Sequence, residues 1–437
     1  MAGHRGRAAR RRLPGSDLRG TRGRPTAHGA GHRHVARAAA HVGSRRAGAG
    51  ADLVTLDGVR GALLAGGLGE RMGPLTADVC KPLVPYAASC RLVDFSVANA
   101  VRSGLPELVL LSQHRESDLV RHLVTHWDER PGTRLHFGPH DALARSGPGA
   151  ILPARPAERG TADALLANAE YLFAPGASDL LVQHADHVYV FDYAPLVAAH
   201  RAADADCTIG VQRIERRYVH LFGMVETDAD LRVRALVEKP ARPTSDLVFT
   251  AFCVFRIDAL REILAELAAL GEDGWQHDIS RDVLPAMIAR GRRVTAYRVP
   301  DYWADIGTVE RYRTEQLRLP DRPHPIPAEA LPRTLAGLSD GFPKYVAGSL
   351  LGAGIPPGAR VERSVVHPGC RIESGATVLR SVVLPGATVP AGSTVRDAIV
   401  TPRGILASAA PADPPPEASP DPFPDPVRRT HGPTLSP

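Results

Sequence analysis

A glycine-rich turn followed by two cations is the stretch of this sequence best suited to chemistry. The turn, residues 66–69, comes directly after the apolar run 62–65, which predicts a buried strand. Glycines let backbone N–H groups approach an anion closely, and a nearby cation can neutralise that anion. Arg71 follows the turn, and Lys81 lies ten residues beyond Arg71. The stretch therefore predicts a phosphate-binding site, although glycines alone would also suit a tight connection.

Lysine is rare in this chain, which adds weight to the two lysines that stand in such settings. There are three lysines, Lys81, Lys239 and Lys344, whereas the other 50 basic residues are arginine. Lys81 and Lys239 each precede a proline. A compact ammonium meets a phosphate differently from a planar guanidinium, so we interpret both lysines as functional. Chance retention is the alternative.

Two familiar phosphate motifs are excluded. Met72 occupies the position of the third glycine in G-x-G-x-x-G, so the dinucleotide fingerprint fits poorly. No Gly-Lys-Ser/Thr ends the turn, so the sequence is not a P-loop. The phosphate site must therefore belong to another class.

Carboxylates and hydroxyls follow predicted elements farther along the chain. Asp186 comes after the strand-like run 179–182, where a carboxylate can hold a divalent cation, although a turn cap is the other role for a lone aspartate. The Gly-Thr pair at 160–161 can offer N–H groups and a hydroxyl to a base or ribose. Glu238 and Lys239 form either a ligand pair or a solvated pair before a turn.

Taken together and in order, these motifs resemble those of the sugar-1-phosphate nucleotidyltransferases, most closely the glucose-1-phosphate adenylyltransferases (ADP-glucose pyrophosphorylases). The resemblance covers residues 59–405, and the joint pattern is far more specific than any single motif. The matching segments are 64–72 (LAGGLGERM), 74–76 (PLT), 81–82 (KP), 91–95 (RLVDF), 159–165 (RGTADAL), 185–189 (ADHVY), 237–240 (VEKP), 276–282 (QHDISRD) and 302–308 (YWADIGT).

The resemblance implies a role for individual residues. Arg71, Lys81 and Asp186 would be catalytic. The nucleotide would be bound by Ala65, Gly66, Gly67, Gly69, Gln113, Gly160 and Thr161, with Gln113 reading the adenine edge. The sugar phosphate would be bound by Glu238, Lys239 and Asp278. Asp186 and Asp305 would hold Mg²⁺.

The chain departs from the family pattern at several positions around the expected pockets. The aromatic residues that usually precede R-G-T-A-D-A are Ala157 and Glu158 here, so a stacking contact to the base is missing. Ala185 replaces a glycine, which would crowd the nucleotide, and Phe249 replaces a small serine in the sugar pocket. Outside these pockets, Glu70 replaces a threonine and Ala87-Ala88 replace a glycine pair.

Strand-like and helix-like segments alternate between residues 59 and 319, which predicts a mostly parallel α/β sheet with ligands at the carboxyl ends of its strands. Predicted strands are 108–111, 179–182 and 207–211; predicted helices are 118–124 and 257–270, the latter ended by Gly271. The resemblance makes this a Rossmann-like mixed-sheet nucleotidyltransferase domain. The predicted domains are a disordered Arg-rich segment 1–57, the catalytic domain 58–319, a linker 320–347, a left-handed β-helix 348–407 and a disordered Pro-rich tail 408–437.

An internal repeat follows the predicted linker. The texts SVVHPG at 364–369 and SVVLPG at 381–386 recur seventeen residues apart. Aliphatic residues at intervals of five or six occupy Val361, Val366, Ile372, Val378, Val383, Val389, Val395 and Val400. This period favours a small β-solenoid in which each coil buries one aliphatic side chain per side, and a run of hairpins is the alternative.

Composition narrows the class of protein. No apolar run approaches the roughly 20 residues of a membrane span. The five cysteines are scattered, which favours a reduced, cytoplasmic protein. Residues 1–50 carry twelve arginines and one acid, so the net charge of +6 leaves −5 for the remainder. A specific nucleic-acid surface on the folded part is therefore not indicated.

The sequence as a whole predicts an enzyme that makes ADP-glucose and pyrophosphate from ATP and glucose 1-phosphate, for glycogen or α-glucan synthesis. By resemblance it would be a homotetramer with an allosteric sugar-phosphate effector. One alternative is a divergent relative that uses another nucleoside triphosphate or sugar 1-phosphate. Another is a regulatory subunit that binds sugar phosphates without turnover, and a solenoid acyltransferase is a weaker third idea.

Overall fold

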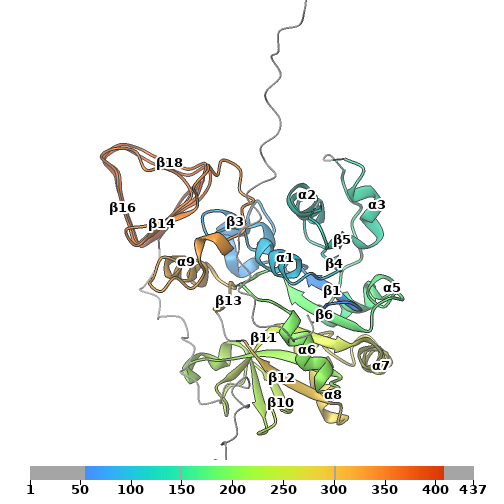
Figure 1. The fold of residues 1–437 in the computed structure, drawn as a ribbon. Helices are drawn as coiled ribbons and strands as arrows, with labels where there is room; N and C mark the ends of the chain where they lie inside the picture. Colours follow the sequence, from blue (N-terminus) through green and yellow to red (C-terminus); the bar gives the residue numbers. More distant parts are fainter. Residues whose placement is uncertain (1–54, 129, 148–149, 300–301, 408–437) are drawn as a thin grey trace, which may run out of the picture. The chain divides into compact units, whose positions relative to one another are not determined.

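The computed structural model describes residues 55–128, 130–147, 150–299 and 302–407 (Figure 1). The predicted disordered segment 1–57 lies outside the described residues except for 55–57, and the predicted tail 408–437 lies outside them altogether. Within the described part of the chain, no helix is long and apolar enough to cross a membrane.

A nine-stranded mixed sheet forms the centre of the first domain, as the resemblance implies. The alternation of segments predicted a mostly parallel sheet, but β11 pairs antiparallel with β6, β8 and β9. Its main path runs β10-β9-β11-β6-β1-β4-β5, and β8 joins β11 to β12. Strand β1 pairs in parallel with β4 and β6, whereas β11 is antiparallel to β6. The strands are β1 (Val59–Leu64), β4 (Glu107–Leu111), β5 (Arg134–His136), β6 (Asp179–His184), β8 (Cys207–Arg213), β9 (Gly223–Thr227), β10 (Val233–Glu238), β11 (Leu247–Arg256) and β12 (Val294–Arg298).

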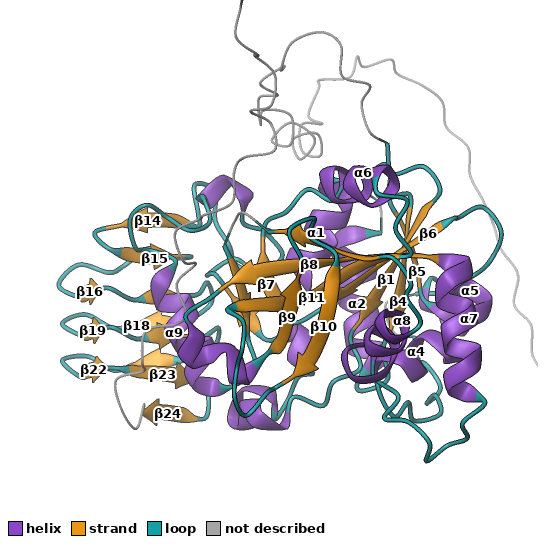
Figure 2. Ribbon diagram, turned by 90° about the horizontal axis from the view of Figure 1, so that it is seen from below, coloured by secondary structure: helices purple, strands orange, loops and turns teal. Residues whose placement is uncertain are grey.

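Helices cover both faces of this sheet (Figures 1 and 2). The α-helices of the domain are α1 (Val93–Arg102), α2 (Glu116–Trp127), α3 (Asp141–Ala144), α4 (Thr161–Ala167), α5 (Ala169–Leu172), α6 (Ala194–Ala202), α7 (Ile257–Ala268), α8 (Leu284–Ala289) and α9 (Val309–Arg318). The shorter turns are 3-10 helices η1 (Glu70–Thr76), η2 (Lys81–Leu83), η3 (Gly138–His140), η4 (Arg216–Leu221) and η6 (Ala328–Ala330), and a π-helix η5 (Ile279–Val283).

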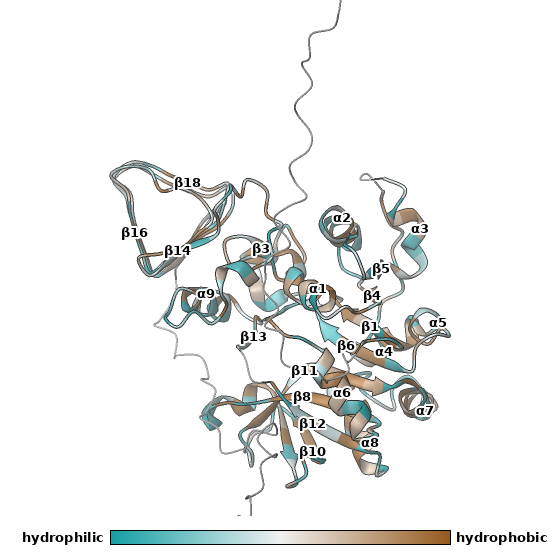
Figure 3. Ribbon diagram, in the orientation of Figure 1, coloured by the Kyte–Doolittle hydropathy of each residue, from teal (hydrophilic) through white to brown (hydrophobic). Residues whose placement is uncertain are grey.

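Strand β1 shows why the sheet has two cores. All six of its residues are buried, as expected for a central parallel strand. Val59 and Leu63 pack with α1, α2 and α6, whereas Ala62 and Leu64 pack with α4, α7 and α8 on the other face. Figure 3 shows brown and teal residues mixed along α2 and α7, the pattern of helices with one buried side. The sheet thus places the carboxyl ends of β1, β4 and β6 side by side.

Small sheets complete the positioning of the site. Strand β7 (His187–Tyr189) pairs antiparallel with β13 (Trp303–Asp305), and β2 (Pro85–Tyr86) pairs with β3 (Cys90–Arg91). The turn between β2 and β3 holds Ala87 and Ala88 at φ +50° and +56°, in the left-handed region that favours glycine. The alanines that replace the family's glycine pair therefore adopt a glycine conformation.

The C-terminal domain is a left-handed β-helix whose successive coils pair in parallel, as predicted. Its three sheets are β14-β15-β17-β20-β23-β24, β16-β19-β22 and β18-β21. Val365 pairs with Val382 and Val382 with Ile399, so each coil contains seventeen residues. Figure 2 shows the strands of successive coils stacked on one another. The strands are β14 (Lys344–Val346), β15 (Ser349–Leu351), β16 (Arg360–Glu362), β17 (Val365–Val366), β18 (Arg371–Ile372), β19 (Thr377–Leu379), β20 (Val382–Val383), β21 (Thr388–Val389), β22 (Thr394–Arg396), β23 (Ala398–Thr401) and β24 (Gly404–Ala407).

The stretch predicted as a linker, 320–347, packs against the catalytic domain. Ile326 and Leu331 are buried in a core that also contains residues of both domains. The hydroxyl of Thr334 donates a hydrogen bond of 2.5 Å to Asp94, a fully buried carboxylate at the start of α1. Strand β14 lies within this stretch and pairs antiparallel with β15 of the solenoid.

Candidate active site

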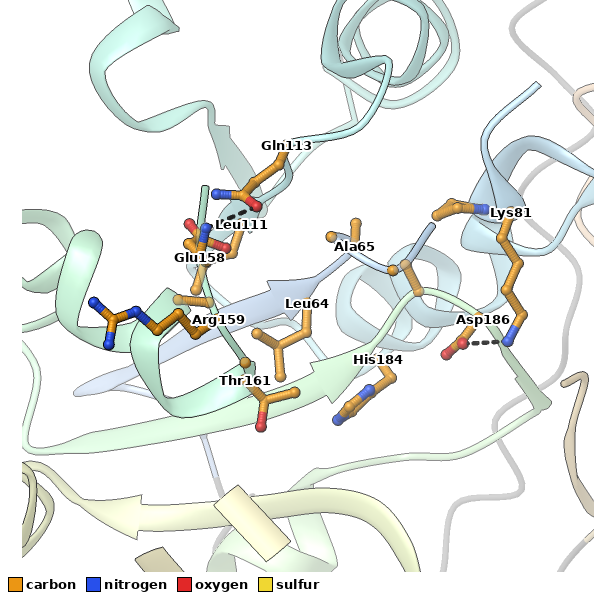
Figure 4. Close-up of a pocket in the computed structure, with 16 residues that line it drawn as sticks. Leu64, Ala65, Lys81, Leu111, Gln113, Glu158, Arg159, Thr161, His184 and Asp186 are labelled. Atoms are coloured by element: carbon orange, nitrogen blue, oxygen red, sulfur yellow. Dashed lines mark hydrogen bonds and ion pairs between the residues drawn. The ribbon is translucent and has the colours of Figure 1, made fainter. Parts of the chain in front are cut away.

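A cavity of about 290 Å³ opens at the carboxyl ends of β1, β4 and β6 (Figure 4). Six of the seven residues predicted to bind nucleotide line it: Ala65, Gly66, Gly67, Gln113, Gly160 and Thr161. Gln113 and Glu158 lie on one side of the view, and Lys81 and Asp186 on the other. The cavity therefore has hydrogen-bonding groups at one end and the buried ammonium group of Lys81 at the other.

Gly69 is the predicted nucleotide ligand that does not line the cavity. It has φ +70°, and a Cβ added there would lie 2.9 Å from the Cβ of Lys81. A side chain at this position would therefore push Lys81 out of place. Gly69 acts on the site by letting the turn pack against that lysine.

The side chain of Gln113 is tied to the neighbouring loop. Its amide donates a hydrogen bond of 2.5 Å to the carbonyl of Pro156 and accepts one of 3.0 Å from the backbone N–H of Glu158. Both polar ends of the amide are thus used within the protein. Gln113 holds the segment that carries Glu158 against the cavity.

Thr161 and Asp278 form one hydrogen-bonded unit behind the cavity. The hydroxyl of Thr161 donates to Asp278 at 3.1 Å and accepts from the backbone of Ile279 at 2.9 Å. Asp278 also caps η5 by accepting from Ser280 N and Arg281 N at 2.9 and 3.1 Å. The carboxylate predicted to bind sugar phosphate is therefore already engaged in fixing the local backbone.

Lys81 and Asp186 form an ion pair with an Nζ–Oδ2 distance of 2.5 Å. Burial alone would lower the pKa of the lysine, but Asp186 and Asp305 outweigh it and raise that pKa. Burial would raise the pKa of Asp186, yet Lys81, His187 and His184 together hold it below the usual range. Both groups are therefore ionised near pH 7.

Asp186, His187 and Asp305 form a cluster that can hold a cation. Their ligand atoms all lie within 4.8 Å of one another, and His187 Nε2 is 3.7 Å from a carboxylate oxygen of each aspartate. Asp186 Oδ1 is buried with no hydrogen-bond partner among the described residues. Two carboxylates, an imidazole and an unsatisfied oxygen fit a divalent cation.

A second cavity of about 250 Å³ adjoins the first, and Thr161 and His184 line both. Its walls include the predicted sugar-phosphate residues Glu238, Lys239 and Asp278 together with Arg71 and Asp305. Lys239 Nζ lies 3.2 Å from Glu238 Oε1 at the end of β10. Arg71, predicted to act on the triphosphate, thus lines this second cavity and not the first.

Apolar groups make up the remaining walls of the second cavity. Phe222, Phe249, Ala251 and Trp303 all line it. The register of β11 shifts between Phe249 and Cys253, and Ala251 there has φ +59°. The bulge therefore directly follows Phe249, the residue that replaces the small serine of the family pattern.

Sequence reasoning gave no role to two histidines of the site. His184 and His187 stack with ring centroids 5.4 Å apart. Burial lowers the pKa of His184 to about 4, so its ring is neutral near pH 7. The sequence could have pointed to His187, because it directly follows the predicted metal ligand Asp186.

Comparison with known families decides the class of the protein. The nucleotidyl transferase family matches residues 60–322, which span the mixed sheet and both cavities. The chain belongs to the nucleotidyl transferase family. The GlmU-like C-terminal hexapeptide family matches residues 340–409, in agreement with the β-helix.

Among nucleotidyl transferases, individual relatives differ in base and acceptor. The chain is 50% identical over 335 residues to a valienol-1-phosphate guanylyltransferase of Streptomyces hygroscopicus subsp. limoneus, covering 72% of this chain and 88% of the relative. It is 38% identical over 258 residues to a glucose-1-phosphate adenylyltransferase of Thermomicrobium roseum, covering 57% of each. The adenylyltransferase of Thermotoga maritima is 31% identical, covering 71% of this chain and 70% of the relative.

These likenesses confirm the predicted superfamily, the sugar-phosphate nucleotidyltransferases. They do not bear out the choice of ATP and glucose 1-phosphate, because relatives of both base specificities match the chain.

Proposed function

We propose that this nucleotidyl transferase uses GTP and a cyclitol 1-phosphate of the valienol type, releasing pyrophosphate and a GDP-linked cyclitol. The observation that carries the proposal is the 50% identity over 88% of a valienol-1-phosphate guanylyltransferase, against 38% and 31% for two adenylyltransferases. The apolar wall formed by Phe249, Ala251 and Trp303 supports it. A carbocycle lacks the ring oxygen of a pyranose, so it asks for fewer polar partners.

In the proposed reaction, a phosphate oxygen of the acceptor attacks the α-phosphorus of the triphosphate. The bond from that phosphorus to the bridging oxygen breaks, and pyrophosphate leaves. Phosphoryl and nucleotidyl transfer need little covalent chemistry from the protein, so positioning and charge stabilisation dominate. The two adjoining cavities suit this demand, since they would present acceptor and triphosphate to each other at Thr161 and His184.

The charged residues divide between the two substrates. Lys81, beside the nucleotide cavity, would stabilise negative charge on the triphosphate and the leaving pyrophosphate. Glu238 and Lys239 would seat the acceptor, one through hydroxyls and the other through the phosphate. Arg71 would reach the acceptor phosphate or the α-phosphate from the second cavity.

Asp186 and Asp305, with His187 beside them, would hold Mg²⁺. When bound, such an ion neutralises and orients the reacting phosphates. Because Lys81 already pairs with Asp186, this lysine would turn from the carboxylate to a phosphate oxygen as the substrates enter.

A second candidate is the ADP-glucose reaction predicted from the sequence motifs. The motifs in catalytic order and the adenylyltransferase relatives favour it. Both candidates use the same groups on the phosphates and differ at the base and at the polyol.

The test is pyrophosphate release by the purified chain with Mg²⁺, each of GTP, ATP, UTP and dTTP, and either valienol 1-phosphate or glucose 1-phosphate. We expect the highest kcat/KM with GTP and valienol 1-phosphate. A clear preference for ATP with glucose 1-phosphate would replace the first candidate with the second. No release from any pair, in folded protein that binds a sugar phosphate, would favour a regulatory subunit.

A further inference from the structure

Glu158 stands at the end of the nucleotide cavity away from the cation. Lys81 and Asp186 lie on the opposite side of the cavity, where a triphosphate would be neutralised (Figure 4). A nucleotide with its phosphates there must place its base toward Glu158 and Gln113. A Cβ added at Gly66 would lie 3.8 Å from Glu158 Oε2, so the glycine keeps the space in front of this carboxylate open.

The carboxylate of Glu158 is the acidic group of this cavity that is left to meet a base. Asp186, the other carboxylate that lines the cavity, is paired with Lys81. Gln113 uses both ends of its amide within the protein. Among the described residues, the carboxylate of Glu158 receives one long hydrogen bond of 3.5 Å, from Asn168 Nδ2 to Oε1.

Hydrogen-bond chemistry says which base suits such a group. An ionised carboxylate accepts hydrogen bonds and donates none. Guanine presents two adjacent donors, N1–H and the 2-amino group, and so matches both oxygens. Adenine presents a 6-amino donor beside the acceptor N1, which would face a carboxylate oxygen without a proton between them. Ala157, the residue before Glu158, offers no aromatic ring on which a base could stack. Hydrogen bonds to the edge of the base therefore contribute more to the choice of base.

We propose that Glu158 is the specificity-determining residue that selects guanine, accepting hydrogen bonds from N1–H and the 2-amino group. This inference rests on the proposed use of GTP, and it adds the group that makes the choice. It also explains why an acid occupies a position where the family pattern has an aromatic residue.

The electrostatics of the loop give the proposal a second signature. Burial raises the pKa of Glu158 to about 7, with Arg155 opposing and Asp163 and Glu116 adding to the rise. Two donors from guanine favour the ionised form, so GTP binding near pH 7 should release a proton from this residue. A protonated carboxyl could instead donate to adenine N1 and accept from its 6-amino group. The preference for GTP over ATP should therefore increase as pH rises from 6 to 8.

The decisive experiment compares wild type with Glu158→Gln, using Glu170→Gln at an exposed position of α5 as the matched control. Dissociation constants for GTP, ITP and ATP with Mg²⁺ are measured by calorimetry. Turnover of GTP and ATP is measured with valienol 1-phosphate as the acceptor. The glutamine amide can accept one bond, but its NH₂ faces a donor of guanine. We expect GTP affinity to fall about 10- to 100-fold and ATP affinity to be maintained or to rise. ITP, which lacks the 2-amino group, should bind wild type more weakly than GTP and should be less affected by the substitution.

The outcomes separate this inference from the proposed function. If wild type binds GTP and E158Q loses that preference while E170Q keeps it, the assignment stands, even if valienol 1-phosphate proves to be the wrong acceptor. An unchanged GTP-to-ATP ratio in E158Q overturns it, whatever the reaction. Wild type that does not prefer GTP over ATP overturns both. Proton release on GTP binding, measured in buffers of different ionisation enthalpy, should disappear in E158Q, and its persistence there would also contradict the assignment.

Discussion

Replacing Asp186 with asparagine would test the cation cluster through stability and turnover together. The substitution removes one member of an ion pair whose lysine side chain is 9% exposed and whose aspartate side chain is 27% exposed. Loss of one partner from a fully buried pair costs about 3–5 kcal/mol. Asp186 is partly solvated and Asp305 still attracts Lys81, so we expect about 1–3 kcal/mol here. In a chain of this size that lowers Tm by about 2–5 °C.

The pH dependence of this loss follows from the two pKa shifts. The pKa of Asp186 is lowered in the folded protein, so its contribution to stability is present above about pH 4 and is lost as pH falls through the folded pKa. The pKa of Lys81 is raised, so its contribution is full below about pH 10.5 and is lost as pH rises through the folded value. The Tm difference between wild type and D186N should therefore be constant from pH 5 to 9 and shrink in acid.

Turnover should respond far more strongly than stability. We expect pyrophosphate release to fall at least about 10³-fold, because a group that organises charge at the reacting phosphates is lost. Binding of Mn²⁺, followed by electron paramagnetic resonance, should weaken in D186N. Asp340→Asn, an exposed carboxylate in the same chain, is the control and should change neither quantity. Wild-type turnover in D186N, or a Tm difference that persists undiminished at pH 3, would refute the reasoning.

Three further predictions concern backbone and packing. Arg363→Gly should stabilise the β-helix by about 0.5–1 kcal/mol, because Arg363 is exposed and has φ +45°, a strained value for a residue with a side chain. Arg371→Gly, at an exposed position in strand β18, should instead destabilise it. Chemical denaturation measures both changes, and a lower free energy of unfolding in Arg363→Gly would contradict the strain argument. Ser381→Ala should cost about 1–3 kcal/mol by the same assay, since the buried hydroxyl accepts from the amide of the next coil at 3.2 Å. Gly160→Ala should lower Tm, because the added Cβ would lie 2.3 Å from a backbone carbonyl oxygen. A Cβ added at Gly67 would have no atom within 4 Å, so Gly67→Ala should weaken GTP binding without lowering Tm. Equal melting of the two alanine variants would argue against a close backbone contact at Gly160.

Local pattern was enough to predict the elements but not the arrangement of the site. Each predicted strand appears in the structure within a few residues of its expected bounds, because buried parallel strands are continuous apolar runs. The eight aliphatic positions of the repeat all lie in strands of the solenoid. Asp186 and Asp305 are far apart in sequence and meet because β7 pairs with β13, which places Asp305 opposite His187. Such pairing depends on tertiary packing that no local motif encodes.

Two predicted ligands form hydrogen bonds within the protein, which the sequence motifs could not predict. Gln113 and Asp278 have the right chemistry for a ligand, yet their polar atoms are used by loop 155–159 and by η5. Hydrogen-bond saturation is a property of the folded neighbourhood, so a motif alone cannot say whether a polar group is available. Glu158 illustrates the reverse case, because a departure from the pattern left an acceptor facing the cavity.

The strands at the ends of the solenoid affect where an extra coil can be added to this domain. Strands β14 and β24 run antiparallel to the strands they pair with, so both edges of that one sheet are reversed strands, whereas the sheets β16-β19-β22 and β18-β21 end in parallel strands. A coil added at either end would have to displace the reversed strand of that sheet, whereas a seventeen-residue duplication inside the stack would preserve every register. Tandem duplication within the gene is therefore a route by which this domain can gain a coil while its two termini, and the contacts of the first coils with the catalytic domain, stay as they are.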